Sequence, residues 1–215
     1  NAIIGLDLKY NLTLKSNIYA QLILDEFTLK EIKANNGYWA NKYGYQIGFK
    51  YYDLLNITNL TLHLERNHAR PYTYSHWNNA NYGHYNEELA HPLGANFSEN
   101  IFILHYRKDR LEIQFKYLDI IYGADYLGDT ISYGNNIYSD YNSRSSDFGI
   151  DMFNGNKTNI DYMQLNLSYI LNPSTNLKID LSLSSRNLSS EIYDYNTLFY
   201  SIGLKSDLFN HYYDF

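Results

Sequence analysis

Cysteine is absent from the 215 residues of this chain. Without cysteine there can be no disulfide, no thiolate nucleophile and no cysteine-based metal site. The sequence also lacks any run of about 18 apolar residues, which excludes a membrane-spanning helix. Membrane-spanning β-strands are not excluded, because they need apolar side chains only at every second position. The mean hydropathy of −0.47 is therefore compatible with a soluble protein or with a β-barrel.

Basic residues are few, with 17 lysines and arginines against 23 aspartates and glutamates, and the net charge is −6. No basic patch stands out, which argues against nucleic acid as a partner. The first residues, Asn1-Ala2-Ile3-Ile4, have no charged region or cleavage site of a signal peptide. We expect either that a signal peptide has been removed or that upstream residues are missing.

Tyrosine is abundant, with 25 residues, and suits a pleated surface or a membrane–water interface. Apolar and polar side chains alternate in nine segments, which predicts nine β-strands, and no segment shows a helical period. The segments are residues 4–12, 18–25, 45–51, 60–67, 100–107, 111–117, 163–169, 177–184 and 198–205. The segment 100–107 is the least regular, because both of its faces are apolar.

The polar face of these segments carries long charged side chains in the middle of the strands. These residues are Asp7, Lys9, Lys50, Glu65, Glu112, Lys116, Lys178 and Asp180. Such charges fit the wet interior of an outer-membrane barrel, whose apolar positions face lipid. A soluble sandwich with its charges facing solvent is the alternative.

The connections between the segments alternate in length. Short ones lie at residues 14–17, 53–59, 108–110 and 172–175, and long ones at 28–43, 71–98, 124–158 and 189–197. Short turns on the periplasmic rim and long loops on the extracellular rim are typical of outer-membrane barrels. The sequence therefore predicts an antiparallel transmembrane β-barrel in a single domain, residues 1–215, with long extracellular loops at about 71–98 and 124–158.

Nine is an odd number, whereas bacterial single-chain barrels have even numbers of strands. We infer that the chain is the C-terminal part of a larger barrel, or that one strand was missed. The end of the chain, His211-Tyr212-Tyr213-Asp214-Phe215, supports a barrel, because a final aromatic after alternating aromatics resembles the recognition signal of outer-membrane barrels. A change of parity near Ser206-Asp207 predicts a β-bulge there.

The stretch 66–97, which contains most of the connection 71–98, is the most unusual part of the chain, since it holds four of the seven histidines among many aromatic and amide side chains. Aromatic faces and planar polar groups are what a carbohydrate site needs. The predicted glycan-contacting residues are Tyr72, Tyr74, His76, Trp77, His84 and His91. A loop that folds into the lumen as a plug is the alternative.

Other constellations are weaker. A metal site from His68, His76, His84 and His91 would have spacings that match no common motif. A hydrolase set from Ser75, His76 and Asn78 lacks a nucleophile elbow. The aspartates of the segment 131–159 do not have calcium-loop spacing. Lys42 can pair with Asp25 or Glu26 across the mouth of a hairpin, which we interpret as an anchor for the loops.

Several stretches resemble the capsule assembly protein Wzi family, and in particular its gliding-motility RemB-like branch. The resemblance covers roughly residues 17–215, and its most specific part is His91-Pro92-Leu93-Gly94-Ala95-Asn96. The stretches that carry it are residues 19–27, 41–48, 71–76, 81–86 and 90–96. The resemblance implies a large outer-membrane barrel with a non-catalytic role in binding surface polysaccharide or in motility machinery.

Together these observations predict a non-enzymatic protein of the outer membrane of a Gram-negative bacterium, without a cofactor. Its expected partners are membrane lipid, cell-surface polysaccharide and other envelope proteins, but not nucleic acid. The alternatives are an accessory barrel of a larger secretion or transport complex, a diffusion channel, and, least favoured, a hydrolase.

Overall fold

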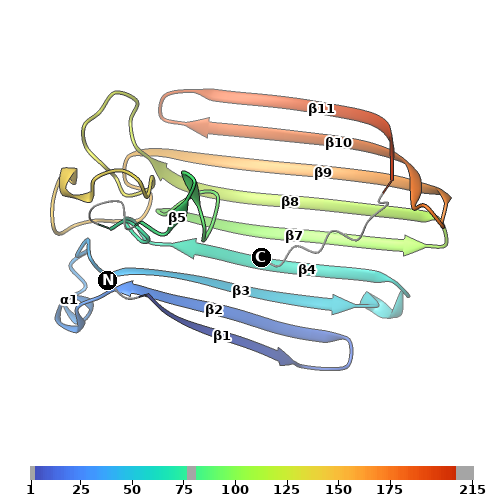
Figure 1. Cartoon of the computed structure of the whole chain (residues 1–215), viewed down its shortest axis with the longest axis horizontal. Helices are drawn as coiled ribbons and strands as arrows, with labels where there is room; N and C mark the ends of the chain where they lie inside the picture. Colours follow the sequence, from blue (N-terminus) through green and yellow to red (C-terminus); the bar gives the residue numbers. More distant parts are fainter. Residues whose placement is uncertain (1–2, 77–80, 207–215) are drawn as a thin grey trace.

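The computed structural model describes residues 3–76 and 81–206, and the fold is all-β. Nine long strands lie side by side in one antiparallel sheet, in the order β1-β2-β3-β4-β7-β8-β9-β10-β11 (Figure 1). Each long strand pairs with the next long strand along the chain, so the sheet is a meander. The nine strands predicted from the alternation are therefore confirmed.

All of the long strands except β1 reach further than the alternation predicted. Their bounds are β1 Ile4–Asn11, β2 Ser16–Glu26, β3 Lys42–Tyr52, β4 Leu60–Ala69, β7 Phe97–Lys108, β8 Leu111–Ala124, β9 Asn156–Asn172, β10 Leu177–Ser190 and β11 Asp194–Lys205. The additional residues lie mainly next to the long connections. In β9, for example, the strand begins at Asn156, although the predicted segment begins only at Met163.

The remaining elements are short: α1 (Leu29–Ala34), β5 (Gly83–His84), β6 (Glu87–Glu88) and the 3-10 turns η1 (Leu54–Asn56) and η2 (Tyr141–Ser143). The sequence did not predict α1, because a helix of six residues is too short to show a helical period. None of the helices in the described ranges is long and apolar enough to cross a membrane.

The long connections 27–41, 70–96 and 125–155 lie at one end of the sheet and short ones at the other, as the sequence predicted (Figure 1). The connection between β10 and β11 was predicted to be long, over residues 189–197, and this was wrong: it lies at the same end as the long connections but comprises only residues 191–193, because both strands extend into the predicted loop. At one end, here called the turn end, β7 and β8 are joined through Asp109 and Arg110. Asp109 adopts a φ of 52°, a left-handed conformation that aspartate tolerates. The opposite end, here called the loop end, holds α1, β5, β6 and the connections 70–96 and 125–155.

The two faces of the sheet differ in what covers them. On the inner face, the sheet residues Ala69 and Phe97 pack with Tyr74, Ala95 and Ile137 of the long connections. The connections therefore fold back over the inner face at the loop end. The outer face is the opposite face, on which the other half of each strand's side chains lies.

Apolar side chains form rows on the outer face, because paired residues lie opposite one another in adjacent strands. One such row runs from β3 to β11 through Tyr51, Leu62, Leu104, Phe115, Leu165, Leu183 and Tyr200. Closer to the loop end, a polar row follows through Arg66, Asn100, Asp119, Asp161, Asn187 and Asn196. The apolar band of the outer face therefore ends at a polar boundary that crosses at least six strands.

The polarity of the inner face changes in the opposite sense along β8, β9 and β10. Beside the apolar band, the inner row consists of Lys116, Gln164 and Ser184. Beyond the polar boundary, the inner row consists of Ile120, Ile160 and Leu188, whose side chains are buried together. The loop-end part of the sheet therefore has an ordinary apolar core, whereas the turn-end part is apolar outside and polar inside.

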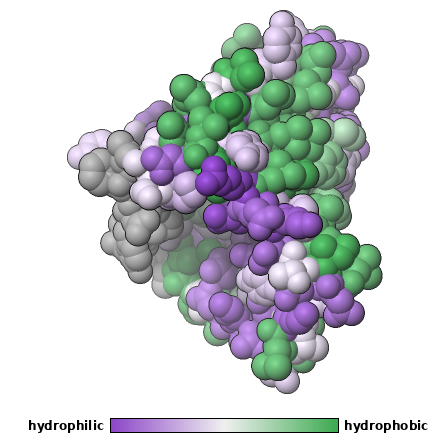
Figure 2. All heavy atoms as spheres, turned by 90° about the vertical axis from the view of Figure 1, so that its right-hand side faces the viewer, coloured by the Kyte–Doolittle hydropathy of each residue, from purple (hydrophilic) through white to green (hydrophobic). Residues whose placement is uncertain are grey.

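The same distribution is visible from the turn end. Figure 2 shows hydrophobic side chains grouped along one side of the molecule and hydrophilic side chains gathered across its middle. The outer-face leucines Leu165 and Leu183 remain 37% and 44% exposed. This part of the described chain therefore leaves a broad apolar surface uncovered.

The sheet is open within the described residues. β1 pairs only with β2, and β11 pairs only with β10. The structure thus confirms the antiparallel all-β architecture of the prediction, without showing a closed barrel or membrane insertion. Ser206 is the last described residue, so the bulge predicted near Ser206-Asp207 cannot be followed, and the aromatic C-terminus lies outside the described residues.

A glycine in β3 fixes the position of a tyrosine that crosses the inner face. The ring of Tyr19 lies over Gly48, where an added Cβ would overlap it. The Tyr19 hydroxyl lies 2.6 Å from Nε2 of His63 and donates to a carboxylate oxygen of Glu65. The missing side chain of Gly48 therefore allows β2 to be tied to β4 across β3.

We predict that Gly48→Ala lowers the free energy of unfolding by about 1–3 kcal/mol, because the added methyl group overpacks against the Tyr19 ring. The measurement is a urea unfolding curve. Gly203→Ala is the matched control, because a Cβ at this strand position meets nothing within 4 Å. Equal effects of the two substitutions would contradict the proposed contact.

Candidate functional site

The connections 70–96 and 125–155 together form a cap over the inner face at the loop end. Tyr72 is 2% exposed, its amide donates to the Gly134 carbonyl at 2.9 Å, and its hydroxyl donates to the Ser132 carbonyl at 2.7 Å. Burial raises the pKa of Tyr72 to about 12, so the hydroxyl keeps its proton at neutral pH. The two connections are therefore held to each other by backbone and side-chain hydrogen bonds.

Asn96 joins the cap to the sheet. Its side chain is fully buried, and Nδ2 lies 2.9 to 3.2 Å from the carbonyl oxygens of Gly123, Tyr133 and Asn154. Its Oδ1 accepts from the backbone amide of Phe153 at 2.7 Å. One amide side chain thus satisfies backbone groups from β8 and from the connection 125–155, which would otherwise be buried without partners.

A buried polar cluster, here called the latch, fixes the start of the cap to β2 and β3. Lys42, whose side chain is fully buried, lies 3.1 Å from Glu26 and donates to the Ser75 carbonyl at 2.8 Å. The amide of Tyr74 donates to Asp25 at 2.9 Å. The sequence left Asp25 and Glu26 open as partners of Lys42, and the structure shows the ion pair with Glu26, which anchors a loop as expected.

His76 completes the latch. Its Nε2 lies 3.0 Å from Oδ1 of Asp25, and its Nδ1 lies 4.0 Å from Glu26. Burial lowers the pKa of His76, while the charge of Asp25 opposes this shift and the charge of Lys42 adds to it. The imidazole is therefore neutral near pH 7, and the contact with Asp25 is polar rather than a full ion pair.

The predicted glycan-contacting residues do not gather on one exposed surface. Tyr72, Tyr74 and His76 are buried in the cap, and Trp77 lies outside the described residues. His84 is exposed on β5. The structure thus places three of the six side chains where surrounding protein covers them, as in the plug alternative, and their role in sugar binding stays a prediction.

His91 lies at the inner face, in contact with the sheet. Its Nε2 is 3.0 Å from Glu99 of β7, and its ring stacks on Phe97 with centroids 4.3 Å apart. Its Nδ1 accepts from the amide of Leu93 at 3.2 Å. These contacts give His91 a structural role in holding the segment 91–96 against the sheet.

The histidines of the candidate metal site also lie apart. His68 stacks on Tyr45 on the outer face, whereas His76 is part of the latch. Within residues 3–76 and 81–206, no group of three or more histidines, aspartates and glutamates is placed to hold a metal ion. Of the candidate hydrolase set, Asn78 lies outside the described residues.

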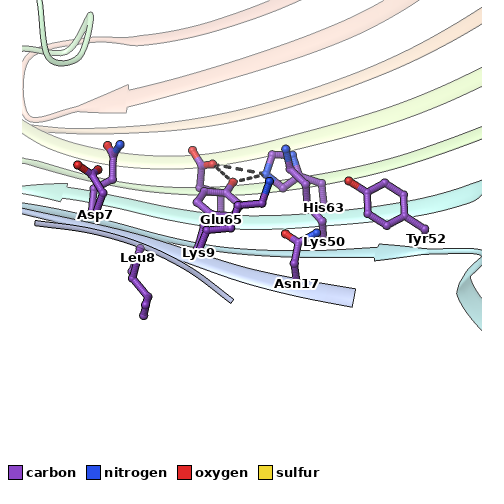
Figure 3. Close-up of a pocket in the computed structure, with 11 residues that line it drawn as sticks. Asp7, Leu8, Lys9, Asn17, Lys50, Tyr52, His63 and Glu65 are labelled. Carbon is purple, nitrogen blue, oxygen red and sulfur yellow. Dashed lines mark hydrogen bonds and ion pairs between the residues drawn. The ribbon is translucent and has the colours of Figure 1, made fainter. Parts of the chain in front are cut away.

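A polar cavity of about 630 Å³ lies on the inner face of β1 to β4, between the cap and the turn end. Figure 3 shows Asp7, Lys9, Lys50 and His63 on one side of the strands, with Leu8 pointing to the other side. The sequence predicted these charges for a wet interior. It could not predict the cavity, because its walls come from four strands.

The charges of the cavity are only partly compensated. Glu65 accepts from Tyr19, from Gln46 at 3.0 Å and from Asn67 at 2.9 Å, so its oxygens are well satisfied. Lys9 and Asp7 have no ion-pair partner within 4.0 Å among the described residues. Such side chains require water or a polar solute, which makes this face a hydrated surface.

Comparisons of the chain with protein-family models, with curated proteins and with solved structures find no match. The resemblance to the Wzi family therefore stays a prediction.

We predict that Lys42→Met destabilises the protein by about 3 kcal/mol, the lower end of the range for breaking a buried ion pair, because Glu26 keeps some access to water. Hydrogen exchange of the Tyr74 amide should accelerate, because the latch holds this segment. The control is Lys30→Met, which removes a highly exposed lysine at 3.7 Å from Glu31. Unchanged exchange at Tyr74 in Lys42→Met would refute the anchoring role.

Proposed function

We propose that the chain forms part of the wall of an outer-membrane β-barrel in a Gram-negative bacterium, with a cap from its own loops over the outer end. The observation that carries this proposal is the reversal of polarity along β8, β9 and β10. Apolar side chains lie outside and polar ones inside near the turn end, and the arrangement is exchanged beyond the polar boundary. Lipid around the outer face near the turn end and water around the outer face beyond the polar boundary would account for the two arrangements.

The dimensions of the apolar band support a membrane location. On β8 the band runs from Leu111 to Tyr117, about 20 Å at about 3.3 Å per residue. This is close to the apolar band of about 25 Å in known outer-membrane barrels. Tyrosines lie near its edges, with Tyr117 toward the loop end and Tyr106 and Tyr169 toward the turn end, as interfacial aromatic side chains do.

A soluble sheet protein is a poorer explanation of the same features. Soluble monomers rarely expose contiguous apolar patches larger than about 600 Å². Here apolar rows continue across the sheet, and the lysine, glutamine and serine residues that would suit solvent lie on the opposite face. A soluble form would need a second apolar layer over the outer face.

The direction of the edge strands bears on how a barrel would close. Because nine strands alternate in direction, β1 and β11 run the same way. Closure with antiparallel pairs throughout would require an odd number of additional strands between them. The proposal is therefore a larger barrel, of which this sheet is a part.

We predict that Leu165→Lys lowers the stability of the membrane-inserted protein by about 2–4 kcal/mol, because it places a charge on the lipid face near the middle of the bilayer. Asn166→Lys is the matched control, because the neighbouring residue of the same strand points to the inner face. Stability is measured by urea unfolding after refolding into phosphatidylcholine vesicles. Failure of the protein to enter the vesicles, or equal effects of the two substitutions, would refute the proposal.

The role proposed for this barrel is non-catalytic contact with surface polysaccharide, as the resemblance to the Wzi family implies. Accessible aromatic rings of the cap are found at the β5–β6 hairpin, where Tyr85 is 89% exposed and packs edge-on against His84 at 4.3 Å between centroids. Exposed rings beside amide groups are suited to stacking on sugar faces. The cap over the inner face disfavours the alternative of an open diffusion channel.

We predict that the double substitution His84→Ala and Tyr85→Ala removes binding to surface polysaccharide on a glycan array while leaving the protein folded. Leu127→Ala is the control, because Leu127 is fully exposed in the other long connection but carries no ring. Undiminished glycan binding by the double variant would remove the hairpin from the site. Absence of glycan binding by the unmodified protein would refute the polysaccharide role itself.

A further inference from the structure

The outer face of β4 changes from apolar to basic within a single strand. Leu60, Leu62 and Leu64 belong to the apolar band, and the next residues on the same face are Arg66 and His68, followed by Arg70 just after the strand. Alternate residues of one strand lie on one face at intervals of about 6.6 Å. Arg66 therefore stands immediately beyond the edge of the apolar band, and Arg70 follows about 13 Å further toward the loop end. These two arginines and the intervening His68 are here called the basic stripe.

Aromatic and polar neighbours hold the basic stripe in place. The ring of His68 stacks on Tyr45 with centroids 4.9 Å apart, and the guanidinium of Arg70 lies 5.9 Å from the ring centre of Tyr43. Arg66 donates to Asn100 at 2.8 Å and to the Tyr45 hydroxyl at 3.4 Å. Both guanidinium groups are thus positioned by uncharged partners.

The two arginines lack a carboxylate partner in the part of the chain that the structure describes, since none lies within 4.0 Å of either. The nearby acidic groups have other contacts: Asp119 accepts from Asn100 at 2.9 Å, and Glu31 accepts from Asn36 at 2.7 Å. Arg70 also lines a cavity of about 360 Å³, together with Tyr43, Glu31 and Asp151. Within the described residues, Glu31 and Asp151 share this cavity but form no ion pair with Arg70, and Arg66 has no ion pair either, so both guanidinium groups can bind an external anion.

We propose that the basic stripe binds the phosphorylated headgroup of a lipid in the outer leaflet. This inference rests on the proposed membrane location, which places the edge of the apolar band at the level of the headgroups. A planar guanidinium group matches a phosphate with two parallel hydrogen bonds. The uncharged rings of Tyr43 and Tyr45 border the site, where interfacial aromatic side chains contact lipid.

The test uses the full-length protein refolded into phosphatidylcholine vesicles with and without lipid A, a diphosphorylated glucosamine lipid. Insertion is measured first, as protease protection in vesicles of phosphatidylcholine alone. Lipid binding is then measured by titration of inserted protein with fluorescent lipid A. We expect Arg66→Gln with Arg70→Gln to weaken this binding about tenfold or more, through the loss of charge-assisted hydrogen bonds to phosphate.

Arg110→Gln is the matched control, because Arg110 lies in the turn between β7 and β8 at the opposite end of the sheet. It should leave lipid A binding unchanged. The double Arg→Lys variant keeps the charge without the planar group and should bind with intermediate strength. Dephosphorylated lipid A should not bind, and free inorganic phosphate at the same concentration should not compete.

The outcomes separate this inference from the membrane proposal. Normal insertion without selective lipid A binding would overturn the headgroup site alone, and so would equal losses in the double Arg→Gln variant and in Arg110→Gln. Competition by inorganic phosphate at the same concentration would replace the lipid with a free anion and overturn it as well. Failure to insert into phosphatidylcholine vesicles would overturn both proposals. If the double Arg→Gln variant does not insert, the double Arg→Lys variant and the dephosphorylated lipid decide the question.

Discussion

The alternation of side chains between the two faces of a strand is the constraint on which this structure depends. The pleat directs successive side chains to opposite faces of the sheet. When one side chain faces a given environment, its two neighbours along the strand therefore face the other one. Along β8, β9 and β10, the apolar side chains change from the outer face to the inner face at the same height in the sheet. This height is marked by Asp119, Asp161 and Asn187. One continuous sheet can therefore cross from one solvent into another without a break in its hydrogen bonds, which is the requirement for β-strands in a bilayer.

The cap is needed because the inner face of the sheet is apolar at the loop end. Beyond the polar boundary, the inner face becomes apolar at Ile120, Ile160 and Leu188 and needs a cover. The long connections supply it, and they bring backbone groups into a buried space where each needs a partner. Asn96 and Lys42 provide such partners, by contacts with carbonyl oxygens from distant parts of the chain. The segments that carry the family resemblance thus take part in closing the loop end.

The proposals place three kinds of surface at three depths. The hydrated cavity around Lys9 and Glu65 lies on the inner face below the cap, the basic stripe lies on the outer face at the edge of the apolar band, and the β5–β6 hairpin is exposed at the loop end. The inner cavity and the basic stripe both include residues of β4. Adjacent residues of this strand, such as Glu65 and Arg66, point to opposite faces of the sheet. A single strand thereby separates a polar interior from a surface suited to lipid.

The sequence by itself determined the strands and the inner and outer position of residues such as Lys116 and Phe115, because these depend on local alternation. It also determined the alternation of short and long connections as far as β10, but not the short turn between β10 and β11. It also indicated that Lys42 contacts Asp25 or Glu26, since all three lie near the mouth of one hairpin. Only the tertiary structure decided that Tyr72, Tyr74 and His76 are buried and that Asn96 joins the connection 125–155 to the sheet. Only the tertiary structure decided, too, that Arg66 and Arg70 form no ion pair with a carboxylate of residues 3–76 or 81–206. The physical reason is that these outcomes depend on packing between segments up to 80 residues apart, as for Arg70 and Ile150, and no local period encodes it.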